Sequence, residues 1–287
     1  MLMKQRKSIR IIFGLFLVAV LLLGLVWFSG QRNVALEFIA LDIGQGDAIL
    51  IKTPYHQNIL VDGGPDNSVI YRLSKNLPFY DRTIDLMILT HPDTDHVTGL
   101  VEVLKRYKVK EILYNGVSHS SPNYLQWIET AEEKRVPMKI GQTGQVIIFG
   151  EGLRLDILYP EHSYSGQEIE DMNDTSIVAK LIYKDTTFML TGDASVKVEK
   201  ELMDGEVNLK SDVLKVGHHG SKTSTCREFV QAVDPQYAVI SVGRDNKFGH
   251  PSLRVIRNLE KEGIEILRTD ELGDVILISD GEEVRRP

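Results

Sequence analysis

The chain has 287 residues, of which 33 are basic, 40 are acidic and one is a cysteine. The single cysteine, Cys226, excludes an intramolecular disulfide and a cysteine-based zinc finger. Five basic residues and no acidic ones lie within the first 33 residues, so the remainder carries 28 basic and 40 acidic residues, a net charge of −12. That balance argues against a general nucleic-acid-binding protein.

An apolar run opens the chain. Residues 11–29 are nineteen residues without a charge, and they follow a basic segment at residues 1–10. About 20 apolar residues span the hydrocarbon core of a bilayer. We therefore predict a single-pass transmembrane signal anchor at 11–29, with residues 1–10 in the cytoplasm and a domain formed by residues 34–287 outside the cell membrane. The alternatives are a signal peptide that is cleaved on secretion and a helix of the protein core.

The rest of the chain alternates between short apolar runs and segments with helical spacing. We expect an α/β domain with two sheets packed face to face and helices outside, and a polar loop at 161–174. Strands are predicted at 34–41, 48–52, 58–61, 84–89, 111–114, 146–149, 153–159, 176–183, 186–190, 212–216, 237–242, 264–267 and 274–278. Helices are predicted at 97–106, 123–134, 196–203, 227–233 and 253–262.

Three polar clusters each follow an apolar strand. HPDTDH (91–96) follows the first, GDA (192–194) the second and GHHGS (217–221) the third. The carboxyl ends of strands are where sheet proteins place their sites. Carboxylate and neutral imidazole together bind divalent transition metals, and carboxylates as close as those in HPDTDH repel one another unless a cation or a proton lies between them. The clusters therefore predict a metal site assembled from separate strand ends.

In this order and spacing the clusters resemble the metallo-β-lactamase fold, a four-layer αββα sandwich. They are most similar to the hydrolase domain of the ComEC family of DNA-uptake membrane proteins, which has HxDxDH where the wider superfamily has HxHxDH. Asp93 stands at the changed position. A complete ComEC protein also has a many-helix membrane channel, which this chain lacks, and one anchor cannot form a DNA-conducting pore. Further matching segments are LDIGQGDAILI (41–51), ILVDGG (59–64), NDTSIVAKL (173–181), LKVGHHGSKTST (214–225), FGHPS (248–252) and RTDELGDVILISDG (268–281).

The resemblance implies two divalent metal ions, zinc or manganese. The carboxylate of Asp93 makes its site harder, which favours Mn²⁺ or Mg²⁺ more than a histidine would. Asp62 is expected to cap a turn or to hold a metal ligand in place through a hydrogen bond. The implied ligands are His91 and Asp93 for the first ion, Asp95 and His96 for the second, Asp193 as the bridge, and His218, in preference to His219, to complete the second site; Asn173 or Asp174 stands where the superfamily often has another histidine.

Residues around the metals are expected to act on the substrate. Asp95 is expected to orient the nucleophile, and His219 and His250 are the candidates for the general acid. Two roles are equally expected for Asp47: it stabilises the turn in which it lies, or it lines the site. The residues expected to contact substrate are Asp47, Asn173, Lys222 and His250, with Lys215, Arg227, Arg244 and Lys247 as further phosphate-gripping candidates, whereas His56, His119 and His162 are expected at the surface.

The leading hypothesis is a membrane-anchored, extracytoplasmic, metal-dependent hydrolase of the ComEC type. It would cleave phosphodiesters of DNA with a hydroxide activated by two metal ions. The membrane and DNA are its expected partners. A second hypothesis keeps the metals and changes the substrate to small esters, choline-phosphate esters, thioesters or β-lactams. A third is a non-catalytic binding module in which the metal site is structural.

Overall fold

A computed structural model describes residues 13–21, 23–24, 35–164, 167, 169, 171–205 and 207–287. The chain divides into two compact units, Met1–Ala35 and Leu36–Pro287. In the first unit, residues 13–21 and 23–24 are helical, and the rest of the predicted anchor at 11–29 lies outside the described residues. Within the described ranges, no helix is both long and apolar enough to cross a membrane.

Two large sheets form the centre of the second unit. The first sheet runs in the spatial order β17 (Val284–Arg285), β16 (Val275–Ser279), β1 (Leu36–Ala40), β2 (Ile49–Lys52), β3 (Asn58–Val61), β5 (Leu86–Leu89), β7 (Ile112–Tyr114) and β8 (Met138–Ile140). The second runs in the order β15 (Glu265–Arg268), β14 (Tyr237–Ile240), β13 (Val213–Lys215), β12 (Thr186–Leu190), β11 (Val178–Tyr183), β10 (Leu153–Tyr159) and β9 (Val146–Gly150). A small parallel pair joins β4 (Thr83–Ile84) and β6 (Lys108–Val109).

Each large sheet has a parallel part, and these parts carry the functional loops. Strands β3, β5, β7 and β8 pair in parallel in the first sheet. Strands β12, β13, β14 and β15 do so in the second. Parallel strands end at the same edge, so the loops that follow them gather on one side of each sheet.

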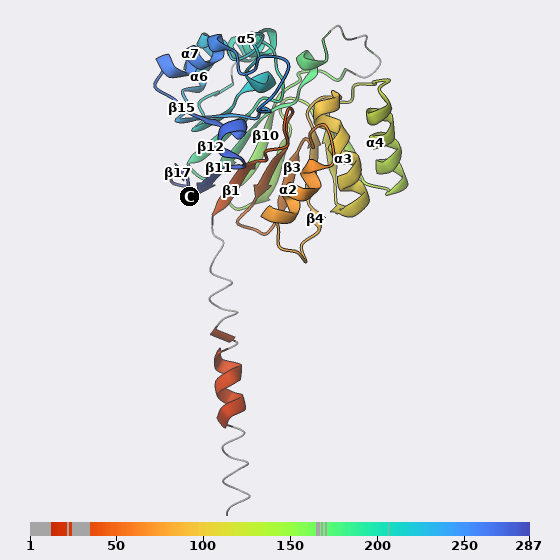
Figure 1. Cartoon of the computed structure of the whole chain (residues 1–287), viewed down its shortest axis with the longest axis vertical. Helices are drawn as coiled ribbons and strands as arrows, with labels where there is room; N and C mark the ends of the chain where they lie inside the picture. Colours follow the sequence, from red (N-terminus) through yellow and green to blue (C-terminus); the bar gives the residue numbers. More distant parts are fainter. Residues whose placement is uncertain are drawn as a thin grey trace, which may run out of the picture. The chain divides into compact units, whose positions relative to one another are not determined.

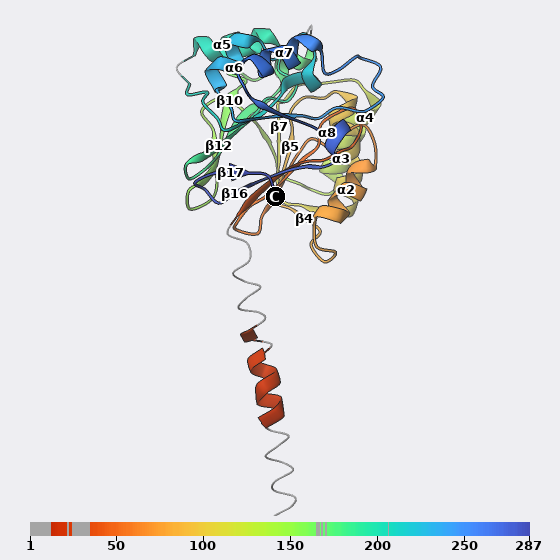
Figure 2. The ribbon, with the colours of Figure 1, turned by 60° about the vertical axis from the view of Figure 1, so that its left-hand side comes forward.

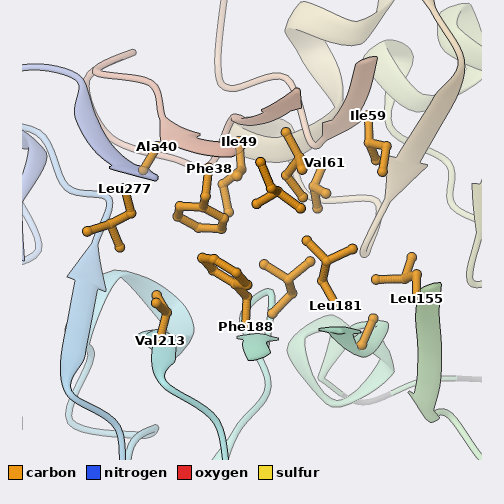
Figure 3. Close-up of a cluster of buried hydrophobic side chains, with 14 of the residues drawn as sticks. Phe38, Ala40, Ile49, Ile59, Val61, Leu155, Leu181, Phe188, Val213 and Leu277 are labelled. Atoms are coloured by element: carbon orange, nitrogen blue, oxygen red, sulfur yellow. The ribbon is translucent and has the colours of Figure 1, made fainter. Parts of the chain in front are cut away.

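The two sheets pack face to face through alternate apolar side chains. The rings of Phe38 on β1 and Phe188 on β12 are stacked, with centroids 5.4 Å apart. Figure 3 shows these rings facing each other across the cluster, with Ile49 and Val61 on the same side as Phe38 and with Leu181 on the same side as Phe188. Apolar burial of this kind contributes about 25 cal/mol per Å² of surface removed from water.

Helices cover the outer face of each sheet. The helices α2 (Ser68–Asn76), α3 (Thr94–Arg106) and α4 (Pro122–Glu133) pack on the first sheet through Leu73, Leu100 and Trp127. The helices α5 (Val196–Asp204), α6 (Arg227–Val233) and α7 (Leu253–Lys261) pack on the second (Figures 1 and 2). Three short helical elements complete the unit: η1 (Met172–Thr175), η2 (Gly217–Gly220) and α8 (Thr269–Leu272). The predicted four-layer αββα order is therefore the observed one.

The structure differs from the sequence prediction mainly in its helices. Helix α2 was not predicted, because only Val69 and Leu73 are buried in an otherwise polar segment. Helix α3 begins at Thr94 instead of 97, because Asp93 has the extended backbone of an N-cap. Asp95 and His96 consequently lie in the first turn of a helix, which fixes the direction of both side chains. Strands β4, β6, β8 and β17, each of two or three residues, were also not predicted.

Candidate metal centre

Loops from both sheets meet at one place. His96 contacts Asp193 and His219 contacts Asp95, so the functional edge of the first sheet lies against that of the second. Each of these side chains follows the carboxyl end of a strand, as the polar clusters predict. The residues that meet are Asp62 after β3, Thr90 to His96 after β5, Asp193 after β12, His218 and His219 after β13, and Ser241 after β14.

His96 is held from behind by a buried carboxylate. Nδ1 of His96 lies 2.9 Å from Oδ2 of Asp62. Asp62 also accepts hydrogen bonds from the backbone N–H and the hydroxyl of Thr90, both at 2.8 Å. A carboxylate only accepts, so Nδ1 of His96 carries the proton of the neutral ring. Its Nε2 is left with a free lone pair directed at the centre.

The same threonine sets the tautomer of His91. Oγ1 of Thr90 lies 3.0 Å from Nδ1 of His91, and its single proton is already donated to Asp62. The contact is therefore a hydrogen bond from Nδ1–H of His91 to Oγ1. Nε2 of His91 is consequently unprotonated. The His91 and His96 rings lie side by side, with centroids 4.1 Å apart.

His219 reaches the centre through an unusual turn. His218 and His219 both have positive φ, 47° and 53°, within η2. Such left-handed backbone is uncommon for residues other than glycine and costs on the order of 1 kcal/mol or more at each position. The turn separates the two rings, whose planes lie 78° apart. His219 is buried, and its Nδ1–H donates to the carbonyl of Ser241 at 3.0 Å, which leaves Nε2 bare.

Two carboxylates face these imidazoles. Oδ2 of Asp193 lies 3.3 Å from Nε2 of both His96 and His219. Oδ2 of Asp95 lies 3.3 Å from Nε2 of His219. Ser195 caps α5, so the helix does not use the carboxylate of Asp193. A bare nitrogen and a carboxylate oxygen are both acceptors, and such a contact is favourable only when a proton or a cation lies between them.

The centre fits a divalent metal site. Within the described part of the chain, Nε2 of His91, His96 and His219 and Oδ1 of Asp193 are buried without a hydrogen-bond partner. A buried polar atom left in that state costs about 1–3 kcal/mol. Ligand atoms lie within 4.8 Å of one another in each of four groups among the described residues: His91, His96 and Asp193; Asp95, His96 and His219; Asp47, Asp193 and His219; and Asp47, Asp62 and His96. Imidazole nitrogens with shared carboxylate oxygens are the donor set of transition-metal centres.

The pKa values describe how the centre behaves without a cation. Burial disfavours a charged imidazole, yet Asp193 and Asp62 raise the pKa of His96 well above its ordinary value. Asp193 and Asp47 do the same for the pKa of His219, again against the effect of burial. Burial would raise the pKa of Asp95, but the contact with the His219 ring and the charge of His96 lower it to about 2. Protons thus occupy the imidazoles where a metal would otherwise bind.

A buried ion pair lies behind His219. Nζ of Lys215 lies 2.8 Å from Oδ2 of Asp47, and both side chains are at most 2% exposed. Oδ1 of Asp47 lies 3.4 Å from Nδ1 of His219. Gly46 lets this loop approach α3, because a Cβ there would lie 2.3 Å from the backbone oxygen of Asp95. The pair therefore fixes His219 from the side opposite the metal centre.

Comparison with known proteins agrees with this geometry. The model of the metallo-beta-lactamase superfamily matches residues 41–244, more than half of the chain. The chain belongs to the metallo-β-lactamase superfamily. Its members are typically metal-dependent hydrolases that bind divalent metals, commonly two, which confirms the predicted fold and enzyme class. Solved structures with this fold include the metallo-beta-lactamase fold protein YhfI from Bacillus subtilis, at 13% identity and a TM-score of 0.53 over 85% of this chain and 99% of that one.

Three competence and recombination proteins are also similar to this metallo-β-lactamase chain. ComE operon protein 3 of Bacillus subtilis is 32% identical over 83% of the chain. Competence protein ComA of Neisseria gonorrhoeae is 30% identical over 81% of it. Recombination protein 2 of Haemophilus influenzae is 29% identical over 93%. The chain spans about a third of the length of these curated relatives, because it covers 32%, 30% and 31% of them.

Within the metallo-β-lactamase centre, His218 and His219 occupy different positions. The sequence favoured His218 over His219 as a ligand. Nε2 of His218 lies 4.0 Å from Asp193, its side chain is 26% exposed, and its Nδ1 lies 3.2 Å from the hydroxyl of Thr223. His219 occupies the buried position instead. Asp93 lies at the rim, with Oδ2 3.5 Å from Nε2 of His91 and a side chain that is 37% exposed.

Several expected substrate contacts lie elsewhere. Asn173 and Asp174 do not line the pocket: the side-chain amide of Asn173 donates to Asp171 at 2.8 Å, and Asp174 contacts Ser195 and Lys197. Lys222 is exposed and does not line the metal pocket. Two of the residues expected to bind phosphate already form ion pairs within the protein. Lys215 contacts Asp47, and Arg227 contacts Glu262.

A pocket of about 300 Å³ opens above the centre, and the sequence missed part of its lining. His250 lines it, as expected. His119 also does, although its turn-like context predicted a surface position. Thr90 and Ser241 were missed because their roles depend on contacts between separate strands. The full lining is Gln45, Asp93, Thr94, Asp95, His119, Asp193, His218, His219, Phe248 and His250.

Proposed function

We propose that this metallo-β-lactamase domain is a phosphodiesterase of the ComEC type that hydrolyses DNA. The observation that carries the proposal is the convergence of buried imidazoles on the carboxylate of Asp193. The bare Nε2 atoms of His96 and His219 both lie 3.3 Å from its Oδ2, and a ring nitrogen of His91 lies within 4.8 Å of the ligand atoms of His96 and Asp193. Two divalent cations, zinc or manganese, supply a nucleophile at neutral pH and neutralise the charge that develops on a phosphodiester when they are bound at such a centre.

The protein's own residues divide into two groups by role. His91, His96, His219 and Asp193 hold the metals, with Asp95 beside them to orient the nucleophile. Their tautomers are fixed in advance by Asp62, Thr90 and Ser241, so little reorganisation is needed when a metal binds. His219 is not available as the general acid in this arrangement, because both of its ring nitrogens are engaged within the centre. His250, at the pocket wall with its Nδ1 unpartnered among the described residues, is assigned to contact the leaving group.

The choice of DNA as substrate rests on the relatives. Two of the three are named as competence-operon or competence proteins and the third as a recombination protein. The chain has the HxDxDH motif that resembles the ComEC hydrolase domain in particular. The proposal is limited to hydrolysis, since the relatives are about three times as long as the matched region.

We assign the domain to the outer side of the cell membrane, with the apolar segment at residues 11–29 as its anchor. The uncharged run and the preceding basic segment support this topology. In the described part, apolar side chains such as Phe13 and Leu15 are more than 60% exposed. Protease added to intact cells should degrade the domain, and carbonate washing should leave it with the membranes. Protection of the domain in intact cells would contradict the assignment.

The test of the function is a cleavage assay with the full-length chain. We expect a single-stranded oligodeoxynucleotide to be cut with Mn²⁺ or Zn²⁺ and to stay intact with EDTA. Asp95→Asn should abolish cleavage, whereas the matched control Asp204→Asn, at an exposed position of α5, should cut normally. A protein that binds metal yet cleaves no nucleic acid with any of several metals would contradict the proposal.

A second substrate class is favoured by the pocket and the charge. A volume of about 300 Å³ suits a small ligand, and the chain is acidic overall. Small esters, including choline-phosphate esters, would fit such a pocket. Hydrolysis of p-nitrophenylphosphorylcholine or nitrocefin without any cleavage of DNA would select this class instead.

A further inference from the structure

One exposed aromatic side chain stands at the mouth of the metal pocket. Phe248 is 69% exposed and also lines the pocket. A single exposed phenylalanine is ordinary on a protein surface, so exposure alone indicates nothing. Phe248 differs in its packing, because one face of its ring is stacked on His250, with centroids 5.7 Å apart and planes 26° apart. The opposite face of the ring is therefore the open one.

The loop that carries Phe248 is held rigidly. The side chain of Asn246 donates to the carbonyls of Gly243 at 2.9 Å and of His250 at 2.7 Å. Its Oδ1 accepts the backbone N–H groups of Phe248 at 3.2 Å and of His250 at 3.0 Å. One amide thus ties both ends of the turn. These hydrogen bonds hold the apolar ring of Phe248 in a position exposed to solvent. The ring is therefore preorganised for contact with a ligand.

A short series of ring contacts joins Phe248 to the metal centre. The His250 ring lies edge-on to that of His218, with centroids 5.6 Å apart. Nε2 of His218 in turn lies 4.0 Å from Oδ2 of Asp193. A group bound at the metal centre therefore has a flat apolar surface within reach on the same side of the pocket.

We infer that Phe248, backed by His250, is a stacking platform for a nucleobase next to the phosphodiester that is cleaved. This inference rests on the proposed phosphodiesterase function and adds a substrate class, unpaired nucleic acid. A base can lie on the open face of Phe248 only when it is not stacked within a duplex. Stacking on an aromatic ring tolerates any base, because every base has a flat π face.

The shape of the platform favours a base over a quaternary ammonium group. Sites for choline surround the cation with several aromatic faces. Here the surface consists of one ring on another, nearly parallel, which presents a single plane. A planar partner matches that plane better than a spherical one.

The experiment pairs enzyme variants with matched substrates, using the full-length chain loaded with Mn²⁺. The substrates are a single-stranded oligodeoxynucleotide and the same sugar-phosphate chain with abasic sites throughout. Phe248→Ala should lower kcat/KM about tenfold on the base-containing strand and leave the abasic strand unchanged. Phe248→Trp should retain the activity on both. The control Phe79→Ala removes a ring that is 89% exposed and lies outside the pocket, and it should change neither rate.

The outcomes distinguish a failure of the stacking role from a failure of the proposed phosphodiesterase function. Equal losses on both strands, or no loss on either, would overturn the platform while leaving the phosphodiesterase intact. Absence of cleavage by the wild type on both strands would contradict the phosphodiesterase itself. A third assay of the same variants uses p-nitrophenylphosphorylcholine. A loss confined to that substrate in Phe248→Ala would assign the ring to a cationic headgroup and overturn the base-stacking role.

Discussion

The floor and the rim of the pocket are built differently. At the floor, each of three histidines has one ring nitrogen fixed by a protein acceptor and the other buried without a hydrogen-bond partner, and those of His96 and His219 face the carboxylate of Asp193. At the rim, His218, Phe248 and His250 contact one another mainly ring to ring and are partly open to solvent. We propose that the floor binds the metals and that the rim contacts the substrate. Changes at the floor should therefore affect metal and stability, and changes at the rim should affect rates on particular substrates.

The largest effect is expected at Asp193. Asp193→Ala removes the carboxylate that faces both His96 and His219, so the variant should lose bound metal and nearly all hydrolytic activity. Metal analysis and an activity assay on the same preparation measure both. Asp204→Ala, on the exposed end of α5, is the matched control. Full metal content in Asp193→Ala would show that the floor does not depend on this residue.

The second-largest effect is expected at the buried ion pair of Lys215 and Asp47, which lies behind the floor. Lys215→Met leaves the carboxylate of Asp47 buried without its cation, which should lower the free energy of unfolding by about 3–5 kcal/mol. Lys200→Met, at an exposed position of α5, should stay within about 0.5 kcal/mol of the wild type. Denaturant unfolding of the metal-free proteins gives both values. Equal stability of the two variants would mean that the pair does not support the floor.

A substitution at Asp62 tests whether this residue fixes the tautomer of His96. Asp62→Ala removes the acceptor for Nδ1–H of His96, so the ring is no longer held with Nε2 bare. Metal affinity should fall by about 10- to 100-fold, as for other residues that orient a metal ligand. Competition with a coloured chelator measures the affinity. An unchanged dissociation constant would rule out this orienting role.

The pH dependence of metal binding is a smaller effect with a defined sign. The raised pKa values of His96 and His219, against burial, mean that the metal-free centre holds protons that a cation must displace. Affinity should therefore rise with pH between about 5.5 and 8.5. The pKa of Asp95 is lowered to about 2, so this carboxyl is already ionised over that range and adds nothing to the slope. Titrations in buffers of different ionisation enthalpy count the released protons, and a flat profile would contradict the proton–metal competition.

The sequence predicted the layers and the strand ends well, because both follow from local pattern. Apolar runs such as 84–89 and 186–190 and the polar clusters after them are visible in the chain itself. The choice between His218 and His219 was not predictable in this way. It depends on two consecutive residues with positive φ and on the carbonyl of Ser241 on a neighbouring strand. Lys215 was misread for a similar reason, since its partner Asp47 lies in the other half of the chain.

The most direct measurement compares the metal content of His219→Ala with that of His218→Ala. These adjacent histidines differ in position, one at the floor and the other at the rim. We predict that His218→Ala retains the metal content of the wild type, about two ions per chain. His219→Ala should bind fewer metal ions per chain. The reverse pattern, with metal lost from His218→Ala and kept in His219→Ala, would contradict the proposed centre.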